Sequence, residues 1–294
     1  MPRMFALLVP LFLMVALVSV AFAADKEFKS NSTVIKVLGN SGKFTVKPPK
    51  GSGAMVTFDY LYELDSTGAE IGNSGNTKHS IQTFASQSFT FGNPTPTVYQ
   101  NVSTTQLDFE TKISSTVGTL KISTYIFGEN GNVGTQTESW AVKKGDVKFN
   151  IELSGWTWCA GNNCKQGNTP KTGAYIDVAI EIKGKNSAEK KKGGNSTYDL
   201  GDKVNLELSN QVLVDGAWQS MPSGYPKVTT KGGKTLFVFR FPKFSNKAVY
   251  DPILGLSESE DSPSQETSGA GKMFSSSLAS LLVITSLFYQ QFAW

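Results

Sequence analysis

Apolar and polar residues alternate with a period of two along several stretches of the chain, as in strands that bury only one face. The apolar positions of these stretches are Val56, Phe58, Tyr60, Tyr62 and Leu64; Leu107, Phe109 and Ile113; Val147, Phe149, Ile151 and Leu153; and Ile176, Val178, Ile180 and Ile182. Residues 236–241 (LFVFRF) are apolar nearly throughout, which predicts a central strand covered on both faces. The pattern therefore predicts strands that send alternate side chains into one interior.

Turn residues separate these strands and favour antiparallel pairing. The separators are Asp215-Gly216, Gly232-Gly233, Gly145-Asp146 and the segment 114–118. No stretch between the two ends has a convincing helical period. We expect an all-β fold, an antiparallel β-sandwich of about ten to twelve strands, over residues 24–256. The charged segment 185–196 (KNSAEKKKGGNS) is typical of a solvated loop, although it could also mark a boundary between two subdomains.

The amino-terminal residues 1–23 predict a secretory signal peptide. Arg3 supplies the positive charge, an apolar run follows it, and the small-x-small motif at 21–23 predicts cleavage after Ala23. A membrane anchor is the alternative, but the apolar run is short of the ~20 residues that a span needs. We expect the mature chain to be secreted.

The carboxy-terminal end predicts a lipid anchor. Residues 257–268 form a polar stalk, and small residues at 268–270 precede a spacer and an apolar tail. This order matches the signal for GPI attachment, which would occur at Ser268 and remove residues 269–294. A short tail anchor and an unprocessed end remain as alternatives. The membrane is therefore an expected partner through the lipid.

The charge balance of the chain excludes some classes of protein. The 28 basic and 24 acidic residues give +4, and without Arg3 and Lys272, which lie in the terminal segments, 26 basic residues face 24 acidic ones, a charge of +2. Such a near-balance is not typical of a nucleic-acid-binding protein. One histidine and two cysteines make a Cys/His zinc site improbable. With no catalytic motif visible, the chain is expected to be a non-enzyme without a cofactor.

A few residues carry specific chemical expectations. Cys159 and Cys164 are separated by four residues and are expected to form a local disulfide, while Trp156 and Trp158 are expected to cap the core or, alternatively, to stack on a sugar. His79 lies among polar residues and is expected to be exposed. Asn31, Asn101 and Asn195 are the expected N-glycosylation sites.

Calcium is the one metal ion for which the sequence suggests a contact, and only a weak one. Glu258, Glu260 and Asp261 form the tightest acidic cluster, but they lie in the predicted stalk, where no rigid cage is expected. Asp177 and Glu181 share one strand face and could contact a mineral surface, although such a pattern also serves solubility alone. No metal site of high affinity is predicted.

Three segments together resemble the acidic skeletal organic matrix proteins of stony corals, which include the skeletal aspartic acid-rich proteins. These segments are 56–63 (VTFDYLYE), 156–166 (WTWCAGNNCKQ) with 174–184 (AYIDVAIEIKG), and 239–255 (FRFPKFSNKAVYDPILG). The resemblance implies an extracellular protein occluded in an aragonite skeleton, with a role in calcium binding and mineral deposition. The long Asp-rich runs of those relatives are missing here, so polyacidic templating does not carry over.

The expected function is that of a non-enzymatic extracellular matrix protein of a calcified skeleton. Its expected partners are a mineral surface or calcium, and other matrix macromolecules. The alternative is a GPI-anchored adhesion or glycan-binding module on the cell surface, which would use Trp156, Trp158 or loops at one end of the sandwich.

Overall fold

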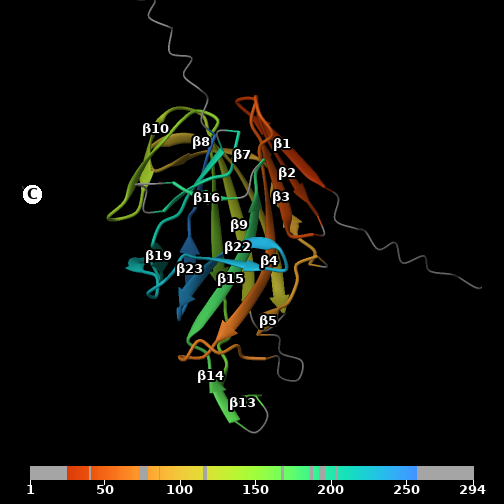
Figure 1. Cartoon of the computed structure of the whole chain (residues 1–294), viewed down its shortest axis with the longest axis vertical. Helices are drawn as coiled ribbons and strands as arrows, with labels where there is room; N and C mark the ends of the chain where they lie inside the picture. Colours follow the sequence, from red (N-terminus) through yellow and green to blue (C-terminus); the bar gives the residue numbers. More distant parts are fainter. Residues whose placement is uncertain are drawn as a thin grey trace, which may run out of the picture. The chain divides into compact units, whose positions relative to one another are not determined.

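The computed structural model describes residues 25–39, 41–72, 79–85, 87–114, 118–166, 169–185, 188–191, 196–202 and 204–256. The regular elements of this part of the chain are all β-strands, so the predicted all-β class is confirmed (Figure 1). No helix in these ranges is long and apolar enough to cross a membrane. The predicted terminal segments, 1–23 and 257–294, lie outside the described residues.

The first sheet has eight antiparallel strands in the order β1-β2-β3-β4-β15-β22-β21, with β5 paired to β4. Its strands are β1 (Lys26–Ser30), β2 (Thr33–Leu38), β3 (Lys43–Lys47), β4 (Ala54–Leu64), β5 (Ser80–Ile81), β15 (Tyr175–Lys183), β21 (Lys227–Lys231) and β22 (Lys234–Pro242). The predicted strand at 236–241 is thus β22, and its apolar side chains are buried on both faces.

The second sheet has twelve strands, built around β8, β9 and β12. Its strands are β6 (Thr90–Phe91), β7 (Thr95–Tyr99), β8 (Val102–Ser114), β9 (Gly118–Phe127), β12 (Val147–Ser154), β16 (Glu189–Lys190), β17 (Thr197–Asp199), β18 (Val204–Glu207), β19 (Gln211–Val214), β20 (Ala217–Ser220), β23 (Lys247–Tyr250) and β24 (Ile253–Leu256). Two separate ribbons are β10 (Gly131–Gly134) with β11 (Ser139–Val142), and β13 (Ala160–Gln166) with β14 (Thr169–Thr172).

The inner faces of the two large sheets pack on one apolar core, which makes the fold a β-sandwich. Phe44 of the first sheet meets Phe109 and Phe149 of the second with ring centroids 5.8 and 5.4 Å apart, and Phe239 meets Tyr250 at 4.4 Å. The described residues contain twenty-four strands rather than ten to twelve. The expected number was too low because many edge strands have only two to four residues and too short a pattern to show alternation.

Two predicted hairpins form as the turn residues indicated. Val214 pairs with Ala217 across Asp215-Gly216, and Lys231 pairs with Lys234 across Gly232-Gly233. Both central residues of each turn have positive φ, 49° and 88° in the first and 58° and 77° in the second. This is the conformation that two-residue hairpins need, and glycine adopts it without steric cost.

A β-bulge in β4 reverses which side chains of this strand point inward. Ala179 pairs with Tyr60 but Ile180 pairs with Phe58, so Asp59 is an extra residue. Beyond the bulge, Tyr60 and Tyr62 lie half-buried on the outer face, stacked 4.3 Å apart. Their predicted inward orientation is therefore wrong, and Leu61 and Glu63 are fully buried instead.

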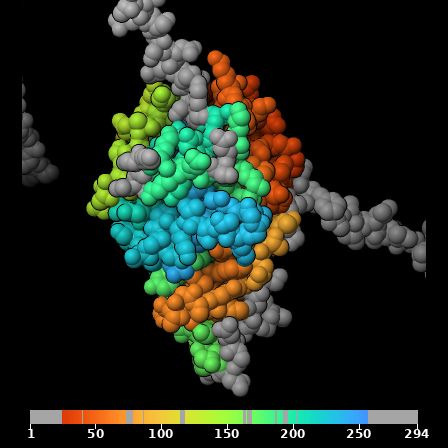
Figure 2. All heavy atoms as spheres, in the orientation of Figure 1, coloured from red at the N-terminus to blue at the C-terminus, as the bar shows by residue number. Residues whose placement is uncertain are grey.

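The outer face of the first sheet carries aromatic and charged side chains close together. Lys231 of the β21–β22 hairpin places its ammonium 4.9 Å from the ring centre of Tyr60, and the blue atoms of this hairpin border the orange atoms of β4 in Figure 2. Arg240 makes two hydrogen bonds of 2.7 Å to Asp177 and lies over the ring of Tyr225. Asp177 is therefore buried in an ion pair.

Candidate functional site

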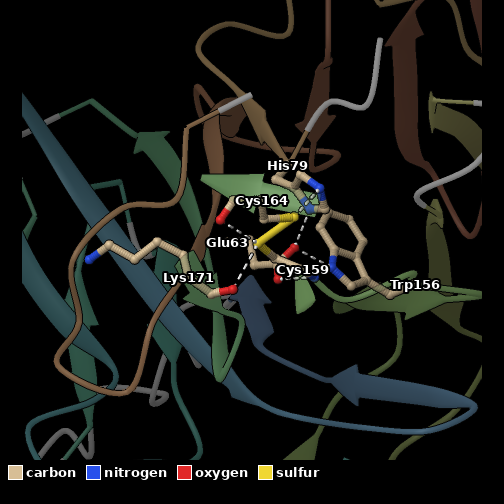
Figure 3. The surroundings of a disulfide bond; sticks show 6 residues. All are labelled: Glu63, His79, Trp156, Cys159, Cys164 and Lys171. Carbon is tan, nitrogen blue, oxygen red and sulfur yellow. Dashed lines mark hydrogen bonds and ion pairs between the residues drawn. A yellow bond between two sulfur atoms is a disulfide. The ribbon is translucent and has the colours of Figure 1, made fainter. Parts of the chain in front are cut away.

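The carboxylate of Glu63 is the centre of a buried polar cluster at the end of the sandwich from which the β13–β14 ribbon projects (Figures 1 and 3). Glu63 Oε2 accepts hydrogen bonds from Trp156 Nε1 at 2.9 Å and His79 Nδ1 at 2.6 Å, and Oε1 accepts one from the backbone N–H of Cys159 at 2.7 Å. Three converging N–H groups suit a carboxylate, which only accepts. The cluster thus joins segments that lie 93 and 96 residues from Glu63 along the chain.

His79 lies beside Glu63 because of the strand pairing between β4 and β5. Leu61 pairs with Ile81 and Tyr62 with Ser80, and the N–H of Glu63 donates to the carbonyl oxygen of His79 at 2.9 Å. His79 as a whole is only 2% exposed. The prediction that His79 is exposed is therefore wrong, because its polar sequence neighbours gave no sign that the residue continues a ladder with a buried strand.

The disulfide predicted from the spacing of the cysteines is present in the structure. Cys159 and Cys164 are joined with their Cα atoms 5.6 Å apart, and both are buried against Ile71. The β13–β14 ladder shifts register between Gly161 and Lys165, which lets the chain turn back to close the ring. Cys164 Sγ lies 3.4 Å from His79 Nε2. The fold thus places the one histidine of the sequence against the cysteine pair, a contact that the sequence did not predict.

Gly173 leaves the space that the carboxylate occupies. A Cβ atom built on Gly173 would overlap Oε1 and the carboxyl carbon of Glu63 and would press on the ring of Trp158. The N–H of Gly173 also donates to the carbonyl oxygen of Cys159 at 3.0 Å, which fixes this backbone close to the cluster. Glycine is thus required here for close approach rather than for an unusual φ.

The two tryptophans are part of the packing around this cluster. Trp156 is 5% exposed and belongs to the main core. Trp158 is half-buried, donates from its indole N–H to the carbonyl oxygen of Phe244 at 2.9 Å, and meets Trp156 edge-on. This arrangement agrees with the core-capping interpretation. A sugar could not stack on Trp156 without first unpacking it.

Asp65 and Lys171 form an ion pair of 2.7 Å at the edge of the same cluster. The hydrogen bond from Lys171, followed by that from the Thr67 hydroxyl, holds the pKa of Asp65 well below its usual value of 3.8. A carboxyl whose pKa is lowered by folding stabilises the fold above its usual pKa and loses that contribution as the pH falls.

We therefore expect an Asp65→Asn variant to be less stable than the wild type at pH 7, with the difference shrinking as the pH falls through about 4. Urea unfolding at pH 7, 5, 4 and 3 measures the unfolding free energies of the variant and of the wild type. A difference that stays constant over this range would show that the ion pair does not set the pKa of Asp65.

Other predicted site residues lie apart from this cluster. Asn31 and Asn101 are exposed at turns with φ of 49° and 66°. Asn31 Nδ2 donates to the carbonyl oxygen of Phe127 at 3.2 Å, and glycosylation of both residues stays a prediction. Glu181 is buried beside Lys183 at 3.0 Å. The suggestion that Glu181 and the ion-paired Asp177 contact mineral is therefore wrong for the folded chain. The remaining predicted residues, Asn195, Glu258, Glu260, Asp261 and Ser268, lie outside the described residues.

Comparison with known protein families gives an assignment that covers most of the chain. The family model for the acidic skeletal organic matrix protein matches residues 18–197 and 185–290. These two stretches include both sheets of the sandwich, the Glu63 cluster and the disulfide ribbon. They overlap at residues 185–197, which include the charged segment 185–196. The chain therefore belongs to the acidic skeletal organic matrix protein family.

Proposed function

We propose that the protein is a non-enzymatic, extracellular component of the organic matrix of a calcified skeleton. The observation that carries this proposal is the family match, because it extends over nearly the whole chain rather than over one motif. The Glu63 cluster supports a structural role for the buried polar groups, since its carboxylate, imidazole and disulfide are enclosed by packed side chains.

The experiment that tests this function is mass spectrometry of protein released by acid from bleached skeleton. We expect peptides from the sandwich, residues 25–256, to be recovered from the cleaned mineral at least as abundantly as from the surrounding tissue. Recovery from tissue membranes alone, with none from cleaned mineral, would contradict the proposal.

Calcium association belongs to the acidic stalk rather than to the sandwich in this proposal. Several carboxylates on the strands are already paired with lysines, as in Asp108 with Lys121 at 2.8 Å and Glu152 with Lys247 at 3.3 Å. The cluster Glu258, Glu260 and Asp261 has three carboxyl groups within four residues. Ordering a chain segment around an ion costs about 1–2 kcal/mol per residue, which weakens binding.

We expect calorimetry to give a calcium dissociation constant in the millimolar range, and replacement of these three acids by alanine to remove most of the heat. Circular dichroism of the variant should be unchanged. A single micromolar site, or full binding by the triple variant, would place the calcium ligands elsewhere in the chain.

A GPI anchor would hold the protein at the cell surface before its incorporation into matrix. The small residues at 268–270, the spacer and the terminal apolar tail support this part of the proposal. We expect phosphatidylinositol-specific phospholipase C to release the protein from expressing cells, and a Ser268→Leu/Gly269→Leu variant to lose its surface attachment. Retention after digestion, with peptides from 278–294 still present, would contradict the anchor.

The alternative function, a glycan-binding or adhesion module, finds no support at the tryptophans. Trp156 is in the core, so only Trp158 and the loops remain available to a sugar. A glycan-array signal lost in Trp158→Ala, in a variant that keeps the wild-type circular dichroism, would favour this alternative over the matrix function.

A further inference from the structure

The chain contains one histidine and two cysteines, and the fold brings all three into one buried cluster. One potential ligand atom from each, His79 Nε2 or Nδ1 and the two Sγ atoms, lies within 4.8 Å of the other two. The histidine directly precedes β5, and the cysteines come from the β13 region, about 80 residues further along the chain. No local sequence pattern requires this convergence.

We propose that reduction of the Cys159–Cys164 disulfide converts this cluster into a buried site for a thiophilic divalent cation, and that Zn²⁺ is the ion it fits. A dithiol reductant would give two electrons and two protons to the disulfide, forming two thiols and the cyclic disulfide of the reductant. Zn²⁺ would then displace both thiol protons and bind two thiolates, the imidazole and, as its fourth ligand, one water molecule.

The distances already approach those of such a site. Zinc–sulfur and zinc–nitrogen bonds of about 2.3 and 2.0 Å place tetrahedral ligand atoms about 3.5–3.8 Å apart. Cys164 Sγ lies 3.4 Å from His79 Nε2. The two sulfurs, which are now bonded, must separate, and Cys159 Sγ, which lies within 4.8 Å of a ring nitrogen of His79, must take its place at the ion. The β13–β14 ladder is irregular between Gly161 and Lys165, the stretch that contains Cys164.

Glu63 prepares the histidine for this role. Its carboxylate holds the Nδ1–H, at 2.6 Å, and so directs the other ring nitrogen, Nε2, toward Cys164. A carboxylate that fixes the non-ligating nitrogen of a histidine is the usual support of a zinc-bound imidazole. Trp156 and the backbone of Cys159 hold Glu63 in turn. Two thiolates and an imidazole favour zinc over calcium, which prefers oxygen ligands.

The test uses Co²⁺ as a spectroscopic probe for zinc. The mature chain is reduced with a phosphine under nitrogen, the reductant is removed, and Co²⁺ is added. We expect one Co²⁺ per chain, with a thiolate-to-cobalt charge-transfer band in the near ultraviolet and the visible bands of a four-coordinate ion. Zn²⁺ should bleach these bands. The oxidised chain is the control and should show none of them.

Two variants separate a metal site from free thiols that merely bind cobalt. His79→Gln keeps a side-chain donor toward Glu63 but removes the ligand nitrogen, and should weaken binding by about tenfold or more; Cys164→Ser should abolish the charge-transfer band. Binding unaffected by His79→Gln would overturn the proposal, as would a reduced chain that binds no Co²⁺. A reduced chain that loses its β-sheet circular dichroism and does not regain it with Co²⁺ would also overturn it. None of these outcomes bears on the matrix function.

Discussion

A Glu63→Gln variant is expected to lose about 3–5 kcal/mol of unfolding free energy. Glutamine has nearly the same shape, but it replaces one carboxylate oxygen with a donor. The side chain then faces the N–H groups of His79, Trp156 and Cys159 with a single acceptor. At least one buried donor is left without a partner, and the charge-assisted hydrogen bonds become neutral ones. Urea unfolding at pH 7 measures the loss.

The matched control is Glu110→Gln, which makes the same change on an exposed position of β8. Its stability should stay within about 0.5 kcal/mol of the wild type. A Glu63→Gln loss below about 1 kcal/mol would mean that the three donors find other acceptors. It would also contradict our placement of Glu63 as the organising residue of the disulfide end.

The second large effect is expected at Lys148, which is 1% exposed. Its ammonium lies 2.9 Å from Asp251 Oδ2 and donates to the backbone carbonyl oxygen of Asp251 at 2.8 Å. Burial lowers the pKa of Lys148, and the carboxylate of Asp251 opposes that shift. We expect Lys148→Met to lower the unfolding free energy by about 3–5 kcal/mol, because it leaves the carboxylate of Asp251 buried without its cation.

Lys121→Met is the control, since the Lys121–Asp108 pair lies on the neighbouring strands with both side chains about one-third exposed. It should cost no more than about 1 kcal/mol. The double variant Lys148→Met/Asp251→Asn should recover part of the loss, because no unpaired charge remains. If Lys148→Met and Lys121→Met lost the same unfolding free energy, the cost of removing the lysine would not depend on how deeply the ion pair is buried.

Much of the sandwich could be predicted from its sequence because a strand buried on one face shows its period of two directly. The stretches at 107–113, 147–153 and 176–182 alternate over enough residues to be recognised, and they became β8, β12 and β15. The same rule places Lys148, which alternates with Val147 and Phe149, on the face toward solvent. Lys148 is buried because Tyr99 and the β10–β11 ribbon cover that end of the sheet, a tertiary contact that has no local signal.

The Glu63 cluster could be predicted only in part for a related reason. The disulfide closes within six residues, so the spacing of the cysteines indicates it. Glu63 could not be placed, because the extra residue Asp59 reverses the alternation of β4 before reaching it. His79 could not be placed either, since its burial depends on a two-residue strand, β5. A bulge and a short strand are both invisible to a periodicity argument.

The position of β15 between β4 and β22 has a consequence for synthesis. Residues 54–64 can complete their sheet only when residues 175–183 are available, and those in turn pair with residues 234–242. During translation the first half of the chain therefore carries strands with open edges and exposed apolar side chains. We expect folding to be largely post-translational and to depend on chaperones of the secretory pathway. Truncation before β22 should yield aggregated chains rather than a smaller stable domain.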